Sequence, residues 1–207
     1  MGGAHTDTTA AVLAALACAG FAAGAVALVW VHFLPTGHKP VRDAVSDYGA
    51  SSYRLFYRTT VISLGVGALL LLAALARGTD IASPGLIWLG VYGVSRIAIA
   101  FFPTDLEGAP VTAIGRVHLA LAAAAFTAIA FAASDLAPAL DSEPGWGASG
   151  LIDVLRWAVV VTAVATLVAR VALPVRRVAF GVVERLLYVA SIAFLVVVSV
   201  EAVIVLG

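Results

Sequence analysis

The sequence predicts an all-α membrane protein, a single domain over residues 1–207 that forms a bundle of six transmembrane helices. Hydrophobic residues make up 62% of the chain and charged residues only 12%, whereas a soluble domain is about half apolar and a quarter charged. Six apolar runs are each long enough to cross a bilayer, which takes about 20 residues. The alternating pattern of a membrane barrel is absent, so these runs must satisfy their backbone polar groups as helices.

The six predicted helices follow one another closely along the chain. They cover residues 10–34, 55–76, 84–102, 111–133, 151–173 and 178–206. The nine residues before the first run contain no Lys or Arg. Because that run is also too long for the apolar region of a signal peptide, we expect a retained helix. The connection at residues 134–150 is rich in Pro, Gly, Ser and acidic residues, which is typical of a loop.

Basic residues are strongly biased to one side of the predicted bundle. Ten of the twelve lie in or beside the first, third and fifth connections: Lys39, Arg42, Arg54, Arg58, Arg96, Arg116, Arg170, Arg176, Arg177 and Arg185. Only Arg77 and Arg156 belong to the other side. Cytoplasmic loops of membrane proteins carry the excess of Lys and Arg. We therefore expect a multi-pass protein of the cytoplasmic membrane with both termini outside.

Several charged and histidine side chains lie inside the apolar runs, all near the predicted cytoplasmic end. At 1.5 Å per residue, residues 96, 118, 184 and 185 lie about 9 to 10 Å inside their runs. Charge at such depth is expensive and therefore suggests a functional site. The expected ligand-binding residues are Arg96, His118, Glu184, Arg185, Asp47 and Asp105. The residues expected around them are Arg58, Arg116, Ser46 and His32.

Other interpretations of these residues stay open at this point. Long arginine side chains can extend to the headgroups and only anchor the bundle. Glu184 can form a structural ion pair with Arg96 or Arg185. His32 and His118, at similar depth, can be arranged as haem ligands. Together with Asp47 and Asp105 they can be assembled into a zinc site, but their spacing matches no recognised metal signature. The sequence assigns no cofactor.

These observations favour one function and leave two alternatives. Arginine suits phosphate and carboxylate groups, so the leading interpretation is binding or transport of a lipid-like or anionic small molecule, with membrane lipids as partners. The alternatives are a membrane enzyme acting on a lipid or prenyl substrate, and a structural or accessory subunit without a ligand. The balance of 12 basic and 12 acidic residues gives no sign of nucleic acid binding. A single cysteine, Cys18, excludes an internal disulfide.

Three short motifs resemble those of a known family. They are SDYGA at residues 46–50, FPTD at residues 102–105 followed by His118, and GVVERL at residues 181–186. In this order they resemble the motifs of the prokaryotic membrane family named domain of unknown function 998. The resemblance implies a six-helix integral membrane protein, and it brings no established activity. The residues that it places in the shared pattern are Asp47, Asp105, His118, Glu184 and Arg185.

Overall fold

The structure is a computed structural model that describes residues 7–207, except for the side chains of residues 173–177. Within these residues all regular secondary structure is helical, and there is no strand. The helices are α1 (Thr8–Val31), the short 3-10 helix η1 (Val45–Ala50), α2 (Arg54–Gly78), α3 (Pro84–Ile99), α4 (Ala113–Asp141), α5 (Ser149–Val171) and α6 (Leu173–Leu206). Each of the six predicted apolar runs therefore forms an α-helix.

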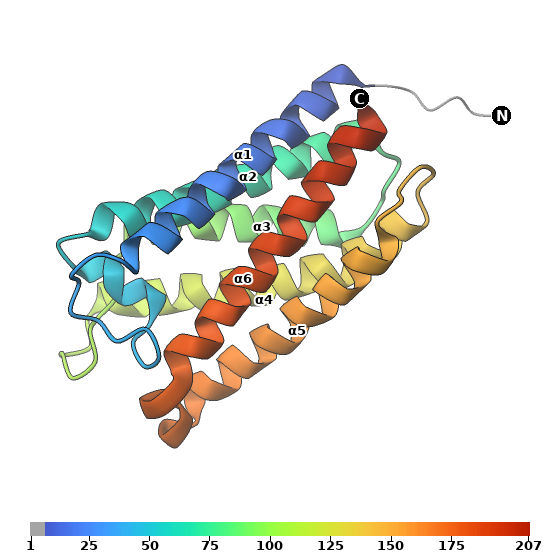
Figure 1. Cartoon of the computed structure of the whole chain (residues 1–207). Helices are drawn as coiled ribbons and strands as arrows, with labels where there is room; N and C mark the ends of the chain where they lie inside the picture. Colours follow the sequence, from blue (N-terminus) through green and yellow to red (C-terminus); the bar gives the residue numbers. More distant parts are fainter. Residues whose placement is uncertain (1–6) are drawn as a thin grey trace.

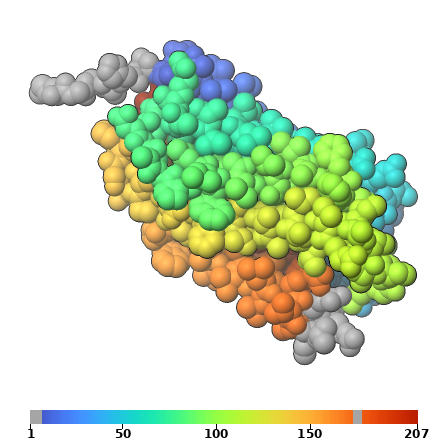
Figure 2. Space-filling model, turned by 180° about the vertical axis from the view of Figure 1, so that it is seen from behind, coloured from blue at the N-terminus to red at the C-terminus, as the bar shows by residue number. Residues whose placement is uncertain are grey.

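The six α-helices run up and down the long axis of one bundle (Figure 1). Each packs against its neighbour in the chain, and α6 packs against both α5 and α1, which closes the ring. Seen from behind, α2, α3, α4 and α5 succeed one another across the surface (Figure 2). Both termini lie at the same end of the bundle, so the loops of residues 32–53 and 100–112 lie together at the opposite end (Figure 1). We call these the terminal end and the loop end.

Five of the helices are long and apolar enough to cross a membrane, namely α1, α2, α4, α5 and residues 178–206 of α6. The sixth, α3, is apolar but has only 16 residues, which corresponds to about 24 Å. Its last turn continues with the tighter hydrogen-bonding pattern of a 3-10 helix, because the amides of Ala100, Phe101 and Phe102 donate to carbonyls three residues earlier. This extension carries the helical path to the residue before Pro103.

Two predicted boundaries are wrong. The loop expected at residues 134–150 is shorter, because α4 continues to Asp141 and contains Pro138. Proline removes one backbone hydrogen bond and usually bends or ends a helix, yet α4 continues for one more turn beyond it. Helix α6 also begins earlier than residue 178, at Leu173, with Pro174 in its first turn, where the missing amide hydrogen costs nothing.

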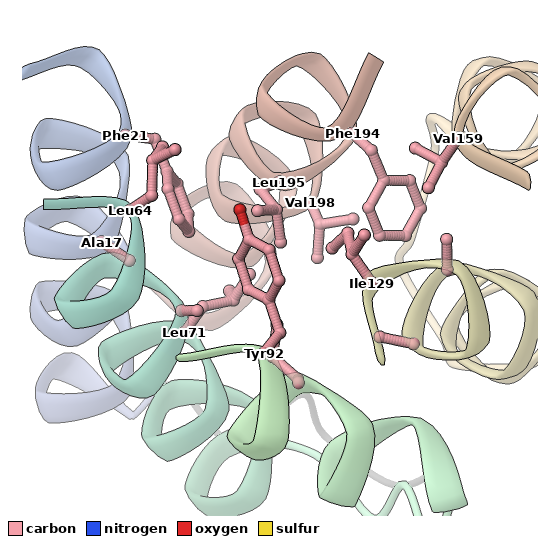
Figure 3. Close-up of a cluster of buried hydrophobic side chains, with 14 of the residues drawn as sticks. Ala17, Phe21, Leu64, Leu71, Tyr92, Ile129, Val159, Phe194, Leu195 and Val198 are labelled. Atoms are coloured by element: carbon pink, nitrogen blue, oxygen red, sulfur yellow. The ribbon is translucent and has the colours of Figure 1, made fainter. Parts of the chain in front are cut away.

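The core runs along the centre of the ring and receives side chains from all six α-helices. Figure 3 shows the fully buried residues Ala17, Phe21, Leu64, Leu71, Tyr92, Ile129, Val159, Phe194, Leu195 and Val198. The large side chains outside this core are also mostly apolar, among them Val26, Leu55 and Ile87. A bundle that is apolar on both its inner and its outer surface is typical of helices in lipid.

Candidate functional site

A cavity of about 360 Å³ opens at the loop end of the bundle. Its walls come from the first half of α4, the last turns of α5, the start of α6 and the two loops at residues 42–47 and 104–111. Polar residues line its rim, and Leu119, Ala122, Phe126 and Leu167 line its apolar part. A cavity of this size lies within the range of small-molecule sites, about 300 to 1,000 Å³. Leu119 and Leu167 are also partly exposed on the outer surface of the bundle, so the apolar part opens sideways between α4 and α5.

Glu184 is the buried acid of the cavity. It lies three turns after the start of α6 and is only 4% exposed. Its Oε2 accepts a hydrogen bond of 2.6 Å from the backbone amide of Val45, at the start of η1. This contact ties the loop before α2 to α6. Among the described residues no hydrogen-bond donor contacts the other carboxyl oxygen, Oε1.

His118 is the buried imidazole of the same cavity. It is 4% exposed, and its Nδ1 lies 2.6 Å from the carbonyl oxygen of Phe102. A carbonyl can only accept, so Nδ1 carries the proton and Nε2 presents a lone pair. No described residue donates to that lone pair. The contact also fixes the end of α3 against the second turn of α4.

Asp105 lines the cavity and binds Thr112, the N-cap residue of α4. Its two oxygens accept hydrogen bonds from the backbone amide and the hydroxyl of Thr112, at 2.8 and 2.9 Å. Thr112 in turn accepts from the amide of Gly115. A Cβ at position 115 would coincide with the Asp105 carboxylate, so only glycine leaves room for it. A carboxylate here also opposes the positive end of the helix dipole. Asp105 therefore holds the N-cap residue of α4 in place.

Asp47 and Ser46 reach the cavity from η1. Oδ2 of Asp47 accepts from the amide of Ala44, at 3.0 Å, which caps the 3-10 helix. Burial raises the pKa of Asp47 above its ordinary value, and the hydrogen bond from Ala44 opposes this shift. Its Oδ1 receives no hydrogen bond from the described residues. Asp47 therefore presents one acceptor near the mouth of the cavity.

Arg185 lies on a different face of α6 from Glu184 and does not line the cavity. Its guanidinium joins three segments: Nε donates to Nε2 of His32 at 2.8 Å, Nη1 to the carbonyls of Asp43 and Gly181 at 2.9 Å each, and Nη2 to the hydroxyl of Tyr48 at 3.0 Å. These contacts hold the end of α1 and the loop before α2 onto α6. We call this set of contacts the Arg185 clamp.

His32 has both ring nitrogens occupied. Nδ1 lies 2.6 Å from the carbonyl of Leu28 and therefore donates, while Nε2 accepts from Arg185. It belongs to the Arg185 clamp and does not line the cavity that His118 lines. The geometry therefore gives no support to a haem held between His32 and His118. Nor do the described residues contain three or more His, Cys, Asp or Glu side chains grouped to hold a metal ion, which removes the basis for the zinc arrangement.

Arg96 is almost completely buried, 1% exposed, and lies behind the cavity wall. Its guanidinium carbon lies 5.2, 5.0 and 4.6 Å from the ring centres of Tyr92, Phe126 and Tyr188. One nitrogen donates to the hydroxyl of Tyr188 at 2.8 Å, and no described residue accepts from Nε. Aromatic faces attract a desolvated cation strongly. Phe126 also lines the cavity, whereas Arg96 does not.

The sequence left open an ion pair of Glu184 with Arg96 or Arg185, and none of the salt bridges among the described residues joins them. Glu184 bonds to a backbone amide, Arg96 to rings and a phenol, and Arg185 to the clamp. Neighbouring positions on a helix diverge by about 100°, which separates Glu184 from Arg185. Arg116 and His118 are two positions apart and diverge by about 200°, so His118 is buried while Arg116 is exposed. Arg58 is exposed and lies outside the cavity.

Sequence reasoning missed the aromatic residues and Thr166. Tyr92 precedes Arg96 by one helical turn, and Tyr188 follows Glu184 by one turn, so each shares a face with a charged residue. A tyrosine one turn from a charge inside an apolar run was the available signal. Thr166 of α5 is 2% exposed and lines the cavity. No sequence feature distinguished it from other threonines.

The three segments that carry the family motifs meet at the loop end. Residues 46–50 contact residues 181–186 through Tyr48 and Arg185, and His118 bonds to Phe102. The family model "Protein of unknown function (DUF998)" matches residues 17–201. The chain belongs to this family. No curated protein and no solved structure is similar to it. The family brings no activity, so the function must be argued from the cavity.

Proposed function

We propose that this DUF998 protein binds or transports a lipid-like small molecule, and that the molecule binds in the cavity at the loop end. The observation that carries the proposal is the combination of an apolar part open between α4 and α5 with a polar part around Glu184, His118 and Asp47. An amphipathic molecule has the same division. Its chain would lie beside Leu119 and Leu167, and its polar end would reach the buried acid and imidazole.

The lipid-like ligand is better supported than the purely anionic one. The anionic ligand was inferred from Arg96 and Arg185, and neither lines the cavity. Arg96 is enclosed by aromatic rings, and the guanidinium of Arg185 donates its hydrogen bonds within the Arg185 clamp. The basic residues in the lining are Arg42 and Arg116, which are exposed, and Arg170, which is half-buried. The two exposed arginines would meet the outer part of a headgroup.

Filling the cavity tests the proposal. Ala122 lines the cavity, and Ala122→Phe places a ring in its apolar part. Ala120, two positions earlier, is exposed and outside the lining, so Ala120→Phe is the matched control. We expect mass spectrometry of purified protein to show a co-purified amphiphile with wild type and Ala120→Phe, at a level reduced about tenfold or more in Ala122→Phe. Equal amounts in all three proteins would contradict the proposal and favour an accessory subunit without a ligand.

A membrane enzyme is the second candidate, and one observation favours it. The Nε2 lone pair of His118 and the carboxyl group of Glu184 face one cavity, and such pairs serve as acid and base in catalysis. If the protein is an enzyme, the His118→Ala protein would still bind the amphiphile but would not convert it, whereas wild type would. Incubation of wild type and His118→Ala with membrane lipid extract, followed by lipid mass spectrometry, separates an enzyme from a binding protein.

We also propose that all six α-helices cross the cytoplasmic membrane, with the loop end in the cytoplasm and both termini outside. The bias of Lys and Arg to the loop end supports this orientation. Because Cys18 is the only cysteine, a Cys18→Ala protein is a clean background. In this background, Gly108→Cys should react with a membrane-impermeant maleimide only after the cells are opened. Gly145→Cys should react with the same reagent in intact cells as well. The reverse pattern would invert the orientation.

A further inference from the structure

We propose that the polar end of the ligand is a protonated amine with N–H donors, an inference that rests on the binding function proposed above. Three polar side chains that line the cavity are at least nine-tenths buried, namely His118, Thr166 and Glu184. They come from three different helices, α4, α5 and α6. What each presents to the cavity follows from the hydrogen bond that it already makes.

All three present acceptors. His118 uses its Nδ1 hydrogen on the Phe102 carbonyl, which leaves the lone pair of Nε2. Thr166 uses its hydroxyl hydrogen on the carbonyl of Thr162, at 2.7 Å, which leaves oxygen lone pairs. Glu184 accepts the Val45 amide on Oε2, which leaves Oε1. A ligand that fits these groups must bring hydrogen-bond donors, because a buried acceptor without a donor is costly.

The charge of the lining selects an ammonium over a neutral hydroxyl. Five acidic residues line the cavity, Asp43, Asp47, Asp105, Glu107 and Glu184, against three arginines. Asp43 and Asp105 have partners in the loops, whereas Glu184 and Asp47, which both line the cavity, each keep one oxygen without a donor among the described residues. An ammonium carries both the donors and the opposite charge, and charge-assisted hydrogen bonds are about twice as strong as neutral ones.

Arg96 does not reverse this selection. Arg96 is deeply buried but does not line the cavity, and its charge lies against the faces of Tyr92, Phe126 and Tyr188. Glu184 and His118 do line the cavity. The amine would thus meet Glu184 and His118 directly, whereas Arg96 is held by aromatic rings outside the lining.

Three probes with the same chain and different polar ends test the inference: octylamine, 1-octanol and octanoate. Their affinities are measured by native mass spectrometry of the full-length protein in detergent. We expect wild type to bind octylamine about tenfold or more tightly than 1-octanol, since one charge-assisted hydrogen bond separates them. Tighter binding of octanoate would overturn the amine and leave the binding function standing. If Ala122→Phe leaves the binding of all three probes unchanged, the proposed function itself fails.

Glu184→Gln is the decisive variant. Glutamine keeps an oxygen to accept from Val45 but carries no charge, so the loop contact is retained and thermal melting verifies the fold. The matched control is Glu201→Gln, because Glu201 lies at the other end of α6 and accepts from the amide of Gly147. We expect Glu184→Gln to lower octylamine affinity about tenfold and to change 1-octanol affinity less than about twofold. Loss of both ligands, or of neither, would overturn the inference.

The amine has two sources, a phospholipid headgroup or a single-chain amine, and competition distinguishes them. Nanodiscs containing phosphatidylethanolamine present an ammonium with N–H donors, and nanodiscs of phosphatidylcholine present one without. Displacement of octylamine by the first alone assigns an aminophospholipid. Retention of octylamine in both assigns a single-chain amine. Equal displacement by the two lipids would overturn the requirement for N–H donors.

Discussion

The two ends of the bundle are held together in different ways. At the terminal end the amide of Asp7 donates to the carbonyl of Leu206 at 2.9 Å, Arg77 pairs with Asp7 at 2.9 Å, and Glu201 accepts from the amide of Gly147 at 3.2 Å. At the loop end, polar side chains within the helices bind backbone and side chains from distant segments, as Glu184 does with Val45 and Arg185 with His32. The buried polar side chains are therefore concentrated at the loop end, where they bind the loops.

This difference shows what the buried polar residues of the loop end do. Apolar packing brings the six helices together at both ends. It cannot fix irregular loop backbone, whose amides and carbonyls need partners. Glu184, His118 and Arg185 each supply a partner to a loop or a helix end. The cavity then forms between loops that are held open in a defined position.

Removal of the Arg185 clamp should have the largest effect on stability. Arg185→Met keeps an unbranched apolar stem but loses four hydrogen bonds, to His32, Asp43, Gly181 and Tyr48. At roughly 0.5 to 1.5 kcal/mol each, we expect a loss of about 3 kcal/mol in the free energy of unfolding. Thermal unfolding in detergent measures it. Arg185→Lys should recover only part, since an ammonium cannot reach all these acceptors from one position. A wild-type melting temperature in Arg185→Met would show that the clamp does not hold the loop end.

A methyl group at Gly181 should have the next largest effect. Its Cβ would meet the carbonyls of Pro40 and Asp43 and the guanidinium of Arg185. Gly181→Ala would therefore push the loop off α6, at a cost of about 2 kcal/mol, as expected for an overpacked contact. Gly150 near the start of α5 has open space around the same position, so Gly150→Ala is the control. Equal melting temperatures for the two variants would mean that the loop is not packed on α6.

Much of this fold was predictable from the sequence, because lipid imposes strong rules on composition and length. The six apolar runs all form helices, and those ending at Pro35 and Pro103 stop before the proline, at Val31 and Ile99. The depth of Glu184 and His118 followed from the fixed rise of a helix, and both line one cavity. The extension of α4 through Pro138 was not predictable, because a proline within a helix and a proline after it give the same local pattern.

The orientation of side chains around each helix was harder to predict than their depth. Arg96 and Glu184 lie at similar depth, but Arg96 faces Tyr92 and Tyr188 rather than the acid. Which face of a helix meets which neighbour depends on packing that one sequence does not specify. The short helix η1 was missed because it depends on tertiary contacts, from Glu184 and Arg185. Those contacts turn a polar loop into one wall of the cavity.

Acidification should weaken the loop end more than the terminal end. His32 lies just beyond the spanning part of α1, and burial together with the neighbouring Arg185 guanidinium lowers its pKa. The unfolded chain therefore binds a proton before the folded protein does, so stability falls as the pH decreases through the ordinary value of histidine, about 6.5. Melting curves between pH 8 and pH 5 measure this. His32→Gln should melt at a lower temperature than wild type at pH 8 and lose part of the pH dependence, and an unchanged slope would contradict the assignment.

The smallest effect should come from the terminal end. The Arg77–Asp7 pair is short, at 2.9 Å, but the arginine side chain is more than half exposed. Water and salt screen such a pair, and holding two long side chains in place opposes its formation. Arg77→Ala should leave the melting temperature within about 2 °C of wild type, and 0.5 M salt should change it no further. Arg185→Met in the same detergent is the comparison, because each variant removes one arginine from the same bundle. If both variants lowered the melting temperature by a similar amount, an arginine at the loop end would contribute no more to stability than one at the terminal end.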